Sequence, residues 1–186
     1  MEHPAQTAVP AARHIVLVGL MASGKTTVGR LLAALLGRPL RDSDAEIEVR
    51  EGRTVREIRG ALGTPALHDL EARVLLEALA SPGPDVITAA GSTAERDECL
   101  EALRGPGVSV AWLRVRPETG AARFRAGAHR PWYGDDPAVF LERQAAAREP
   151  HLASVATLVL DADDRAPSDL AEAILAALAG WDAARG

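Results

Sequence analysis

Short apolar runs alternate with helical patterns along almost the whole of this 186-residue chain. The runs fall at residues 14–18, 39–41, 85–89, 108–115 and 157–160, and the first of them contains β-branched residues, as is typical of a buried parallel strand. Apolar positions at helical spacing fill the other segments, at residues 26–36, 44–51, 55–62, 67–79, 94–103, 118–125, 137–148 and 168–181. The alternation predicts an α/β fold, a five-stranded parallel sheet with helices on both faces, whose ligand-binding loops lie at the carboxyl ends of the strands.

The pattern predicts one domain, residues 13–186, preceded by a loose N-terminal tail at residues 1–12. Residues 127–136 stand apart because they have no apolar period and combine glycine, arginine, proline, aromatic and acidic residues. A surface loop and a mobile lid both fit this composition. Arg130, followed by Pro131, favours the lid, since phosphate chemistry uses movable cationic donors.

Residues 19–26 read Gly-Leu-Met-Ala-Ser-Gly-Lys-Thr, which matches the phosphate-binding pattern G-x-x-x-x-G-K-[ST] between a predicted strand and a predicted helix. The glycines let the backbone wrap a polyphosphate, and the start of the helix adds partial positive charge. Lys25 is long enough to reach the outer phosphates, and the Thr26 hydroxyl suits Mg2+. The alternative is a glycine turn that merely joins strand to helix. We predict that ATP binds here with Mg2+, at Gly19, Ala22, Ser23, Gly24, Lys25, Thr26 and Thr27.

Charge and composition narrow the function classes. A net charge of −5 argues against general affinity for nucleic acid. The single cysteine, Cys99, excludes an internal disulfide or a cysteine zinc site, and its acidic neighbours oppose thiolate formation. No apolar run approaches membrane-spanning length, and the first residues lack a signal-peptide core. We therefore expect a soluble, cytoplasmic protein without nucleic-acid or membrane partners.

Further motifs follow the phosphate-binding loop in a characteristic order. They are Asp42-Ser43-Asp44, the stretch from Gly63 to Glu71, Arg130-Pro131, and Arg148-Glu149-Pro150-His151-Leu152. Their order and spacing resemble those of the shikimate kinases, single-domain members of the nucleoside-monophosphate-kinase-like P-loop group, from about residue 13 to residue 178. The resemblance implies a monomeric kinase with a mobile lid. Such an enzyme transfers the γ-phosphoryl group of ATP to a hydroxyl of a small metabolite, most concretely shikimate.

The resemblance also implies roles for individual residues. Asp42 would hold Mg2+, which agrees with the preference of a hard cation for carboxylate oxygen. Asp44 would bind the acceptor and orient its hydroxyl, a role that we favour over the alternative that it merely caps the next helix. Lys25 and Arg130 would stabilise charge on the migrating phosphoryl group. Arg123 and, more weakly, Arg165 are candidates for the adenine side, and Glu71 belongs to the acceptor side.

The acceptor site departs from the family pattern at several positions. The family grips the shikimate carboxylate with two arginines and a triple-glycine turn, whereas here Arg148 remains and His68 replaces the other arginine. Ala90-Gly91-Ser92 stands where the glycines would be, and Leu152 replaces a tyrosine. An imidazole offers a carboxylate one donor and is half-charged only near pH 6.5.

Three readings of the altered pocket follow. The chain is a shikimate kinase with a relaxed carboxylate grip, or a kinase of another hydroxylated metabolite such as a cyclitol or sugar. The third reading is a nucleotide-binding regulator without catalysis. The residues that phosphoryl transfer needs argue against this third reading, because all are retained: Gly24, Lys25, Thr26, Asp42, Asp44 and Arg130.

Overall fold

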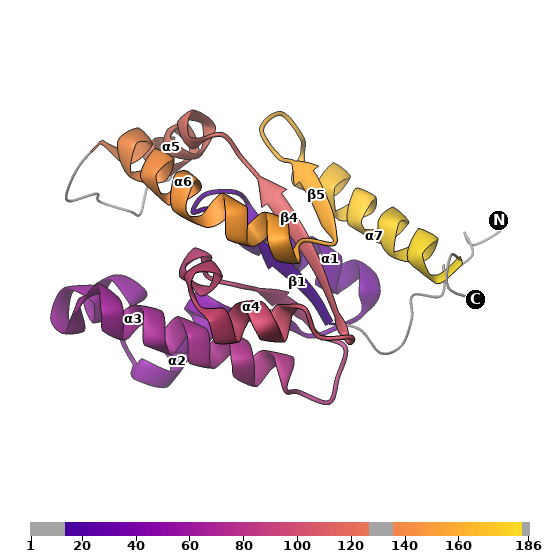
Figure 1. The fold of residues 1–186 in the computed structure, drawn as a ribbon, viewed down its shortest axis with the longest axis horizontal. Coiled ribbons are helices and arrows are strands. Elements are labelled where there is room, and N and C mark those ends of the chain that lie inside the picture. Colours follow the sequence, from indigo (N-terminus) through magenta and orange to yellow (C-terminus); the bar gives the residue numbers. More distant parts are fainter. Residues whose placement is uncertain (1–13, 127–135, 184–186) are drawn as a thin grey trace.

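The computed structural model describes residues 14–126 and 136–183 and has the predicted five-stranded parallel sheet. The strands lie in the order β2-β3-β1-β4-β5, and every neighbouring pair is parallel (Figure 1). Parallel pairing at each step puts all the carboxyl ends at one edge of the sheet, where ligand-binding loops gather. The strand bounds are β1 His14–Val18, β2 Leu40–Asp42, β3 Val86–Thr88, β4 Val108–Arg114 and β5 Leu158–Asp161.

Helices cover both faces of the sheet, as predicted, with α1 and α7 on one side and α3, α4 and α6 on the other (Figure 1). Strand β1 shows why, because its side chains alternate between the faces. Ile15 and Leu17 pack in the core under α1 and α7, and Val16 and Val18 pack in the core under α3, α4 and α6. The helix bounds are α1 Lys25–Leu36, α2 Ser43–Glu51, α3 Val55–Leu79, η1 Gly91–Glu95, α4 Asp97–Leu103, α5 Pro117–Ala126, α6 Pro137–Val155 and α7 Pro167–Ala183.

Two helix predictions are wrong in detail. The single helix expected at residues 94–103 is a 3-10 helix, η1, followed by α4, because Arg96 between them has extended backbone (φ −118°, ψ 119°). Helix α6 does not end at residue 148 but continues through Pro150 to Val155. Its last turns bury Leu152 and Val155 in the core, which outweighs the backbone hydrogen bond that the proline removes. Leu152 is therefore a core residue.

The helices predicted at residues 55–62 and 67–79 meet at Gly63 within α3. Gly63 has φ 86° and ψ 166°, a conformation that glycine adopts readily, so the two halves of α3 point in different directions. Thr54 and Glu57 form the expected capping box at the start of the helix.

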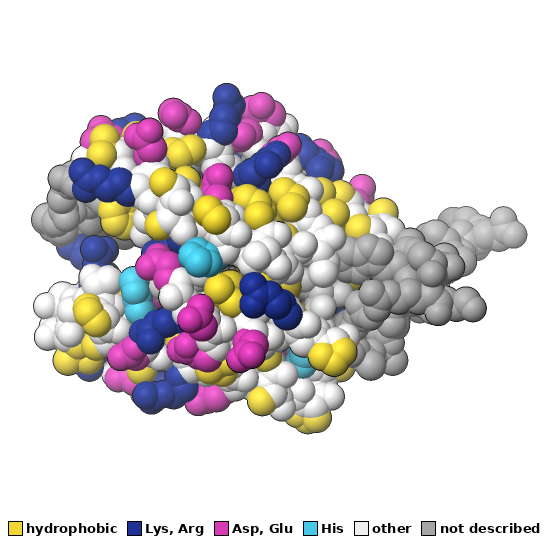
Figure 2. Space-filling view, in the orientation of Figure 1, with side chains coloured by type: hydrophobic (Ala, Val, Ile, Leu, Met, Phe, Trp, Pro, Cys, Tyr) yellow, Lys and Arg dark blue, Asp and Glu magenta, His cyan; other side chains and the backbone are white. Residues whose placement is uncertain are grey.

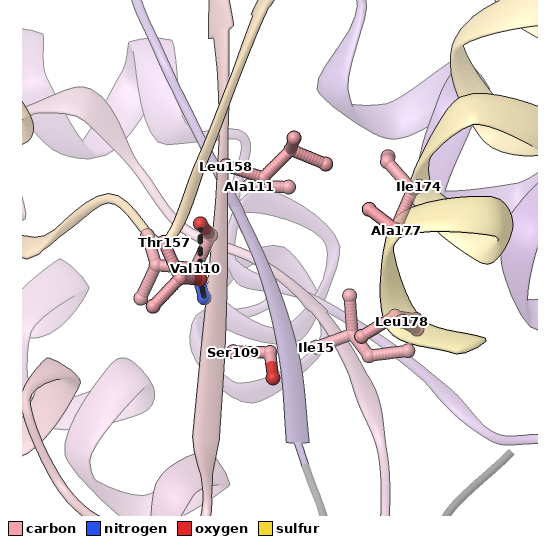
Figure 3. Close-up of a pocket in the computed structure, with 9 residues that line it drawn as sticks. All are labelled: Ile15, Ser109, Val110, Ala111, Thr157, Leu158, Ile174, Ala177 and Leu178. Atoms are coloured by element: carbon pink, nitrogen blue, oxygen red, sulfur yellow. Dashed lines mark hydrogen bonds between the residues drawn. The ribbon is translucent and has the colours of Figure 1, made fainter. Parts of the chain in front are cut away.

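Packing between the sheet and α7 leaves a gap of about 10 Å3 beside Ile15, Ser109, Leu158 and Ile174 (Figure 3). The Ser109 hydroxyl is buried and has no hydrogen-bond partner among the described residues. Ser109 pairs with Ile15 near the amino ends of the strands, so the gap lies away from the carboxyl edge. Its size, about that of one water molecule, makes it a packing defect and not a ligand site.

Candidate active site

The phosphate-binding loop joins β1 to α1 at the carboxyl edge of the sheet. Three of its residues have positive φ, Gly19 (145°), Ala22 (62°) and Gly24 (95°), so the backbone turns sharply. A Cβ on Gly19 would lie 2.5 Å from the Leu113 carbonyl oxygen of β4, which leaves room there for glycine alone. Gly24 caps α1 without a side chain, and the first amide groups of the helix are thus placed for an anion.

Lys25 folds back across this loop. Its Nζ donates to the carbonyl oxygens of Gly19 and Leu20, both at 2.9 Å, which holds the ammonium group inside the curve of the loop. Next to it, Ser23 is 1 % exposed, and its hydroxyl has no hydrogen-bond partner within residues 14–126 and 136–183. A half-buried cation and an unsatisfied buried hydroxyl in a concave loop fit a polyphosphate. Thr27, the last residue predicted to bind nucleotide, is exposed in the first turn of α1.

Asp42 brings three elements together beside the loop. Its Oδ2 accepts hydrogen bonds from Thr26 Oγ1 at 2.9 Å and from Thr88 Oγ1 at 2.8 Å, so β2, α1 and β3 meet at one carboxylate oxygen. Its Oδ1 accepts from the Ala45 amide at 3.2 Å and caps α2. Hard oxygen donors of this kind fit Mg2+, which takes few protein ligands and completes its shell with phosphates and water. The described residues contain no cluster of three His, Cys, Asp or Glu side chains for a metal. Thr26 and Asp42 stay the residues predicted to hold Mg2+.

Asp44 lies in the first turn of α2, two residues after the cap. Because Asp42 is the cap, the alternative that Asp44 merely caps this helix is wrong. The charge of Asp44 raises the pKa of Glu71, which places the two carboxyl groups near each other across α2 and α3. The predicted acceptor residues Asp44 and Glu71 therefore lie close enough to interact electrostatically.

Glu71 is buried, 8 % exposed, and accepts a hydrogen bond from the Ser92 hydroxyl of η1. Burial and, to a smaller extent, the charge of Asp44 raise the pKa of Glu71 to about 7. The Ser92 hydrogen bond and the charges of Arg148 and Lys25 lower it but do not compensate. Glu71 thus exchanges its proton near neutral pH. Ser92, which stands where the family has a glycine, donates a hydrogen bond to this carboxyl group.

Arg148 is also buried, 6 % exposed, although it carries a full charge. Its Nε donates to Glu95 Oε1 at 2.5 Å, and a Cβ on Gly91 would lie 2.9 Å from its Nη1. Burial and the charge of Arg148 lower the pKa of His68, so the imidazole is mostly neutral at pH 7. The structure therefore brings the predicted residues His68, Gly91 and Arg148 together, with Ala90 as the residue before η1.

The predicted adenine-side residues lie at the β5 end of the carboxyl edge. Arg123 of α5 donates to the carbonyl oxygens of Ala162 and Asp163, at 2.5 and 2.8 Å, and so ties α5 to the segment after β5. Arg165 is exposed and donates to the Asp169 carbonyl oxygen at 3.1 Å. Arg130 and the predicted lid, apart from its last residue, Asp136, lie outside the described residues.

Comparison with known proteins gives this arrangement a family. A sequence model described as shikimate kinase matches residues 21–179. The chain belongs to the shikimate kinase family. It is 44 % identical over 165 residues to a shikimate kinase of Symbiobacterium thermophilum, covering 87 % of this chain and 94 % of the relative. It is 40 % identical over 168 residues to one of Caulobacter vibrioides, covering 90 % and 82 %.

Solved structures of the shikimate kinase family agree. A shikimate kinase from Acinetobacter baumannii in complex with shikimate superposes with a TM-score of 0.83 at 32 % identity, covering 91 % of this chain and 94 % of the other. A gluconokinase from Sinorhizobium meliloti, at 23 % identity and a TM-score of 0.63 with 91 % and 93 % covered, shares the fold. The family consists of phosphotransferases that act on a hydroxyl, and this chain is an enzyme of that class.

Sequence reasoning missed two residues of this shikimate-kinase-like site, Thr88 and Glu95. Thr88 ends an apolar strand beside β1, and a polar residue at that carboxyl end is a signal that was present in the sequence. Glu95 carried no signal of its own, because its contact with Arg148 spans 53 residues. Cys99 is buried, and burial raises its pKa to about 11, which agrees with the expectation of an unreactive thiol.

Proposed function

We propose that this chain transfers the γ-phosphoryl group of ATP to a hydroxyl of shikimate, giving shikimate 3-phosphate and ADP. The observation that carries the proposal is the position of Asp42, which joins Thr26 of the phosphate-binding helix to the strand that leads into the acceptor helix α2. The phosphate site and the acceptor site are thus neighbours along one edge of the sheet. Phosphoryl transfer depends mainly on such positioning.

In the proposed reaction, the acceptor oxygen forms a bond to the γ-phosphorus, and the bond from that phosphorus to the β,γ-bridging oxygen breaks. Asp44 orients the attacking hydroxyl and accepts its proton as the new bond forms. Lys25 and the amide groups at the start of α1 stabilise the charge that develops on the phosphoryl oxygens. Mg2+ held by Thr26 and Asp42 would neutralise phosphate charge. Arg130 stays a predicted donor to the same group.

The acceptor end supports shikimate less strongly than the phosphate end supports ATP. Arg148 is retained, but Glu95 already occupies its Nε, and His68 is mostly neutral at pH 7. This observation favours a second candidate, a hydroxylated acceptor without a carboxylate, such as a cyclitol or sugar. No helix in the described part of the chain is long and apolar enough to cross a membrane. A cytoplasmic location and a monomeric state stay predictions.

The test is ADP release by purified protein with ATP and Mg2+, measured with and without shikimate. Shikimate-dependent turnover that saturates below about 1 mM, within the usual range of KM values, is the expected result. Absence of stimulation, with ATP binding confirmed in the same sample, would contradict shikimate as the acceptor. Turnover with a carboxylate-free cyclitol or sugar in its place would establish the second candidate.

A further inference from the structure

A carboxylate of this chain already binds the arginine at the acceptor end of the site. Arg148 of α6 is buried, and its Nε donates to Glu95 Oε1 at 2.5 Å. The Glu95 side chain, at the end of η1, is 41 % exposed and so reaches the pair from the solvent side. Nη1 of the same guanidinium lies against Gly91, at the other end of η1. The Arg148 guanidinium therefore lies beside both ends of this short helix.

The geometry of η1 explains why Glu95 reaches this position. A 3-10 helix has three residues per turn, so side chains three apart lie on the same face. Ser92 and Glu95 share a face in this way, with the Ser92 hydroxyl on Glu71 of α3 and the Glu95 carboxylate on Arg148 of α6. One turn of helix thus connects both walls of the acceptor site.

Among the described residues around the pair, Arg148 is the buried cation that an anion at this end of the site would meet. Burial and Arg148 itself lower the pKa of His68, while Glu95 raises it and does not compensate, so His68 is mostly neutral at pH 7. Arg96, the next residue after η1, is paired with Asp69 of α3 and lies 3.9 Å from Glu98. A carboxylate that enters this end of the site therefore meets Arg148 together with the negative charge of Glu95.

We propose that Glu95 is a specificity-determining residue of the acceptor site, because it competes with a carboxylate on the acceptor for Arg148. This inference rests on the proposed phosphoryl transfer at the same site. A carboxylated acceptor must displace Glu95 or bind beside it, and both cost affinity. An acceptor with a hydroxyl at that position can donate to Glu95 and leaves the ion pair intact. Glu95 therefore lowers the affinity for carboxylated acceptors relative to acceptors that carry a hydroxyl at that position.

The test is Glu95→Gln, which keeps the side-chain oxygen that accepts from Arg148 and removes the charge. Dissociation constants are measured by calorimetry for shikimate and for its analogue in which the carboxylate is replaced by a hydroxymethyl group. We expect binding of shikimate to tighten about tenfold, as one charge-assisted hydrogen bond is worth, and binding of the analogue to change by less than about twofold. The matched control is Glu98→Gln, an exposed carboxylate of α4 that pairs with Arg96, and it should change neither constant.

Melting temperatures equal to that of the wild type would show that both variants fold. An equal change in affinity for both acceptors would overturn the proposal. Weaker binding of shikimate to Glu95→Gln would also overturn it, because Glu95 would then orient Arg148 for the ligand. Failure of the proposed function alone has a different signature: tighter shikimate binding to Glu95→Gln with no ADP release from either protein. Binding of shikimate to neither protein would overturn both.

Discussion

The nucleotide side and the acceptor side of this site are built in different ways. The predicted nucleotide side is a continuous loop, residues 19–26, in which Lys25 Nζ donates to the backbone carbonyl oxygens of Gly19 and Leu20. The acceptor side is assembled from side chains of separate elements, Asp44 of α2, Glu71 of α3, Ser92 of η1 and Arg148 of α6. A loop made of backbone tolerates little change, because Gly19 has no room for a side chain. A pocket made of side chains from four elements changes its ligand preference one residue at a time.

Among the proposed variants, removal of the Lys25 side chain on the nucleotide side should have the largest effect on turnover. Lys25→Ala should lower the rate of ADP release by at least about 10³-fold, since the cation at the transferred group is lost while the loop backbone remains. Arg30→Ala, an exposed cation of the same helix, is the control and should keep its activity. Turnover by Lys25→Ala near the wild-type rate would contradict the assignment of the loop.

Asp42 is the predicted Mg2+ ligand of the nucleotide side and the cap of α2 on the acceptor side, and two variants separate these functions. Asp42→Asn keeps an oxygen that caps α2, while Asp42→Ala removes both the cap and the charge. Both should raise the Mg2+ concentration for half-maximal rate about 10- to 100-fold. Only Asp42→Ala should also lower the free energy of unfolding, by about 1 kcal/mol, in urea denaturation. An unchanged Mg2+ requirement in both variants would exclude Asp42 as a metal ligand.

The raised pKa of Glu71, on the acceptor side, should lower the free energy of unfolding at high pH. Because its pKa rises from 4.5 in the unfolded chain to about 7 in the fold, the folded protein holds a proton that the unfolded chain releases between these values. Its contribution to the free energy of unfolding is complete below pH 4.5 and declines by about 3 kcal/mol as pH rises through 7.

Glu71→Gln should remove this dependence. Urea unfolding of the wild type and the variant at pH 5 and pH 8 should show the variant gaining stability relative to the wild type at the higher pH. Glu142→Gln, an exposed carboxylate of α6, is the control for the loss of one charge. The same difference between variant and wild type at both pH values would show that Glu71 has an ordinary pKa.

His68→Arg should move the acceptor side back toward the family pattern and has the smallest expected effect. A guanidinium offers a carboxylate two donors and a permanent charge, so the affinity for shikimate should rise about tenfold. His151→Arg adds the same charge at an exposed position of α6 and should leave the affinity unchanged. A loss of affinity in His68→Arg would indicate a carboxylate-free acceptor.

The pH dependence of the wild type sharpens the same point. If the cationic form of His68 binds the acceptor carboxylate, the affinity for that acceptor should weaken as pH rises from about 5.5 to 7.5, because the imidazole loses its proton. Burial and the charge of Arg148 favour this loss, since both lower the pKa of His68. His68→Arg should show no such change, since the guanidinium keeps its charge throughout this range. Equal slopes for both proteins would assign the dependence to another group.

The missed features follow from the range of the interactions that cause them. The end of α6 was predicted too early because a proline usually stops a helix, and the burial of Leu152 and Val155 that extends it depends on packing. The 3-10 helix η1 was predicted as a regular helix because its local sequence gives no sign that Arg96 is extended. Neither the length of α6 nor the extended backbone of Arg96 can be predicted from local sequence patterns.

The sequence by itself determined the strands, their parallel arrangement and the phosphate-binding loop, since each depends on residues close together in the chain: an apolar run, or eight residues with two glycines and a lysine. The resemblance to the shikimate kinases also indicated most of the predicted acceptor residues. Only the tertiary structure decided how these residues act on one another. The pKa of Glu71 depends on burial and on Ser92, 21 residues away, and the state of Arg148 depends on Glu95, 53 residues away. Such couplings arise only when the fold brings charges together and removes water from between them.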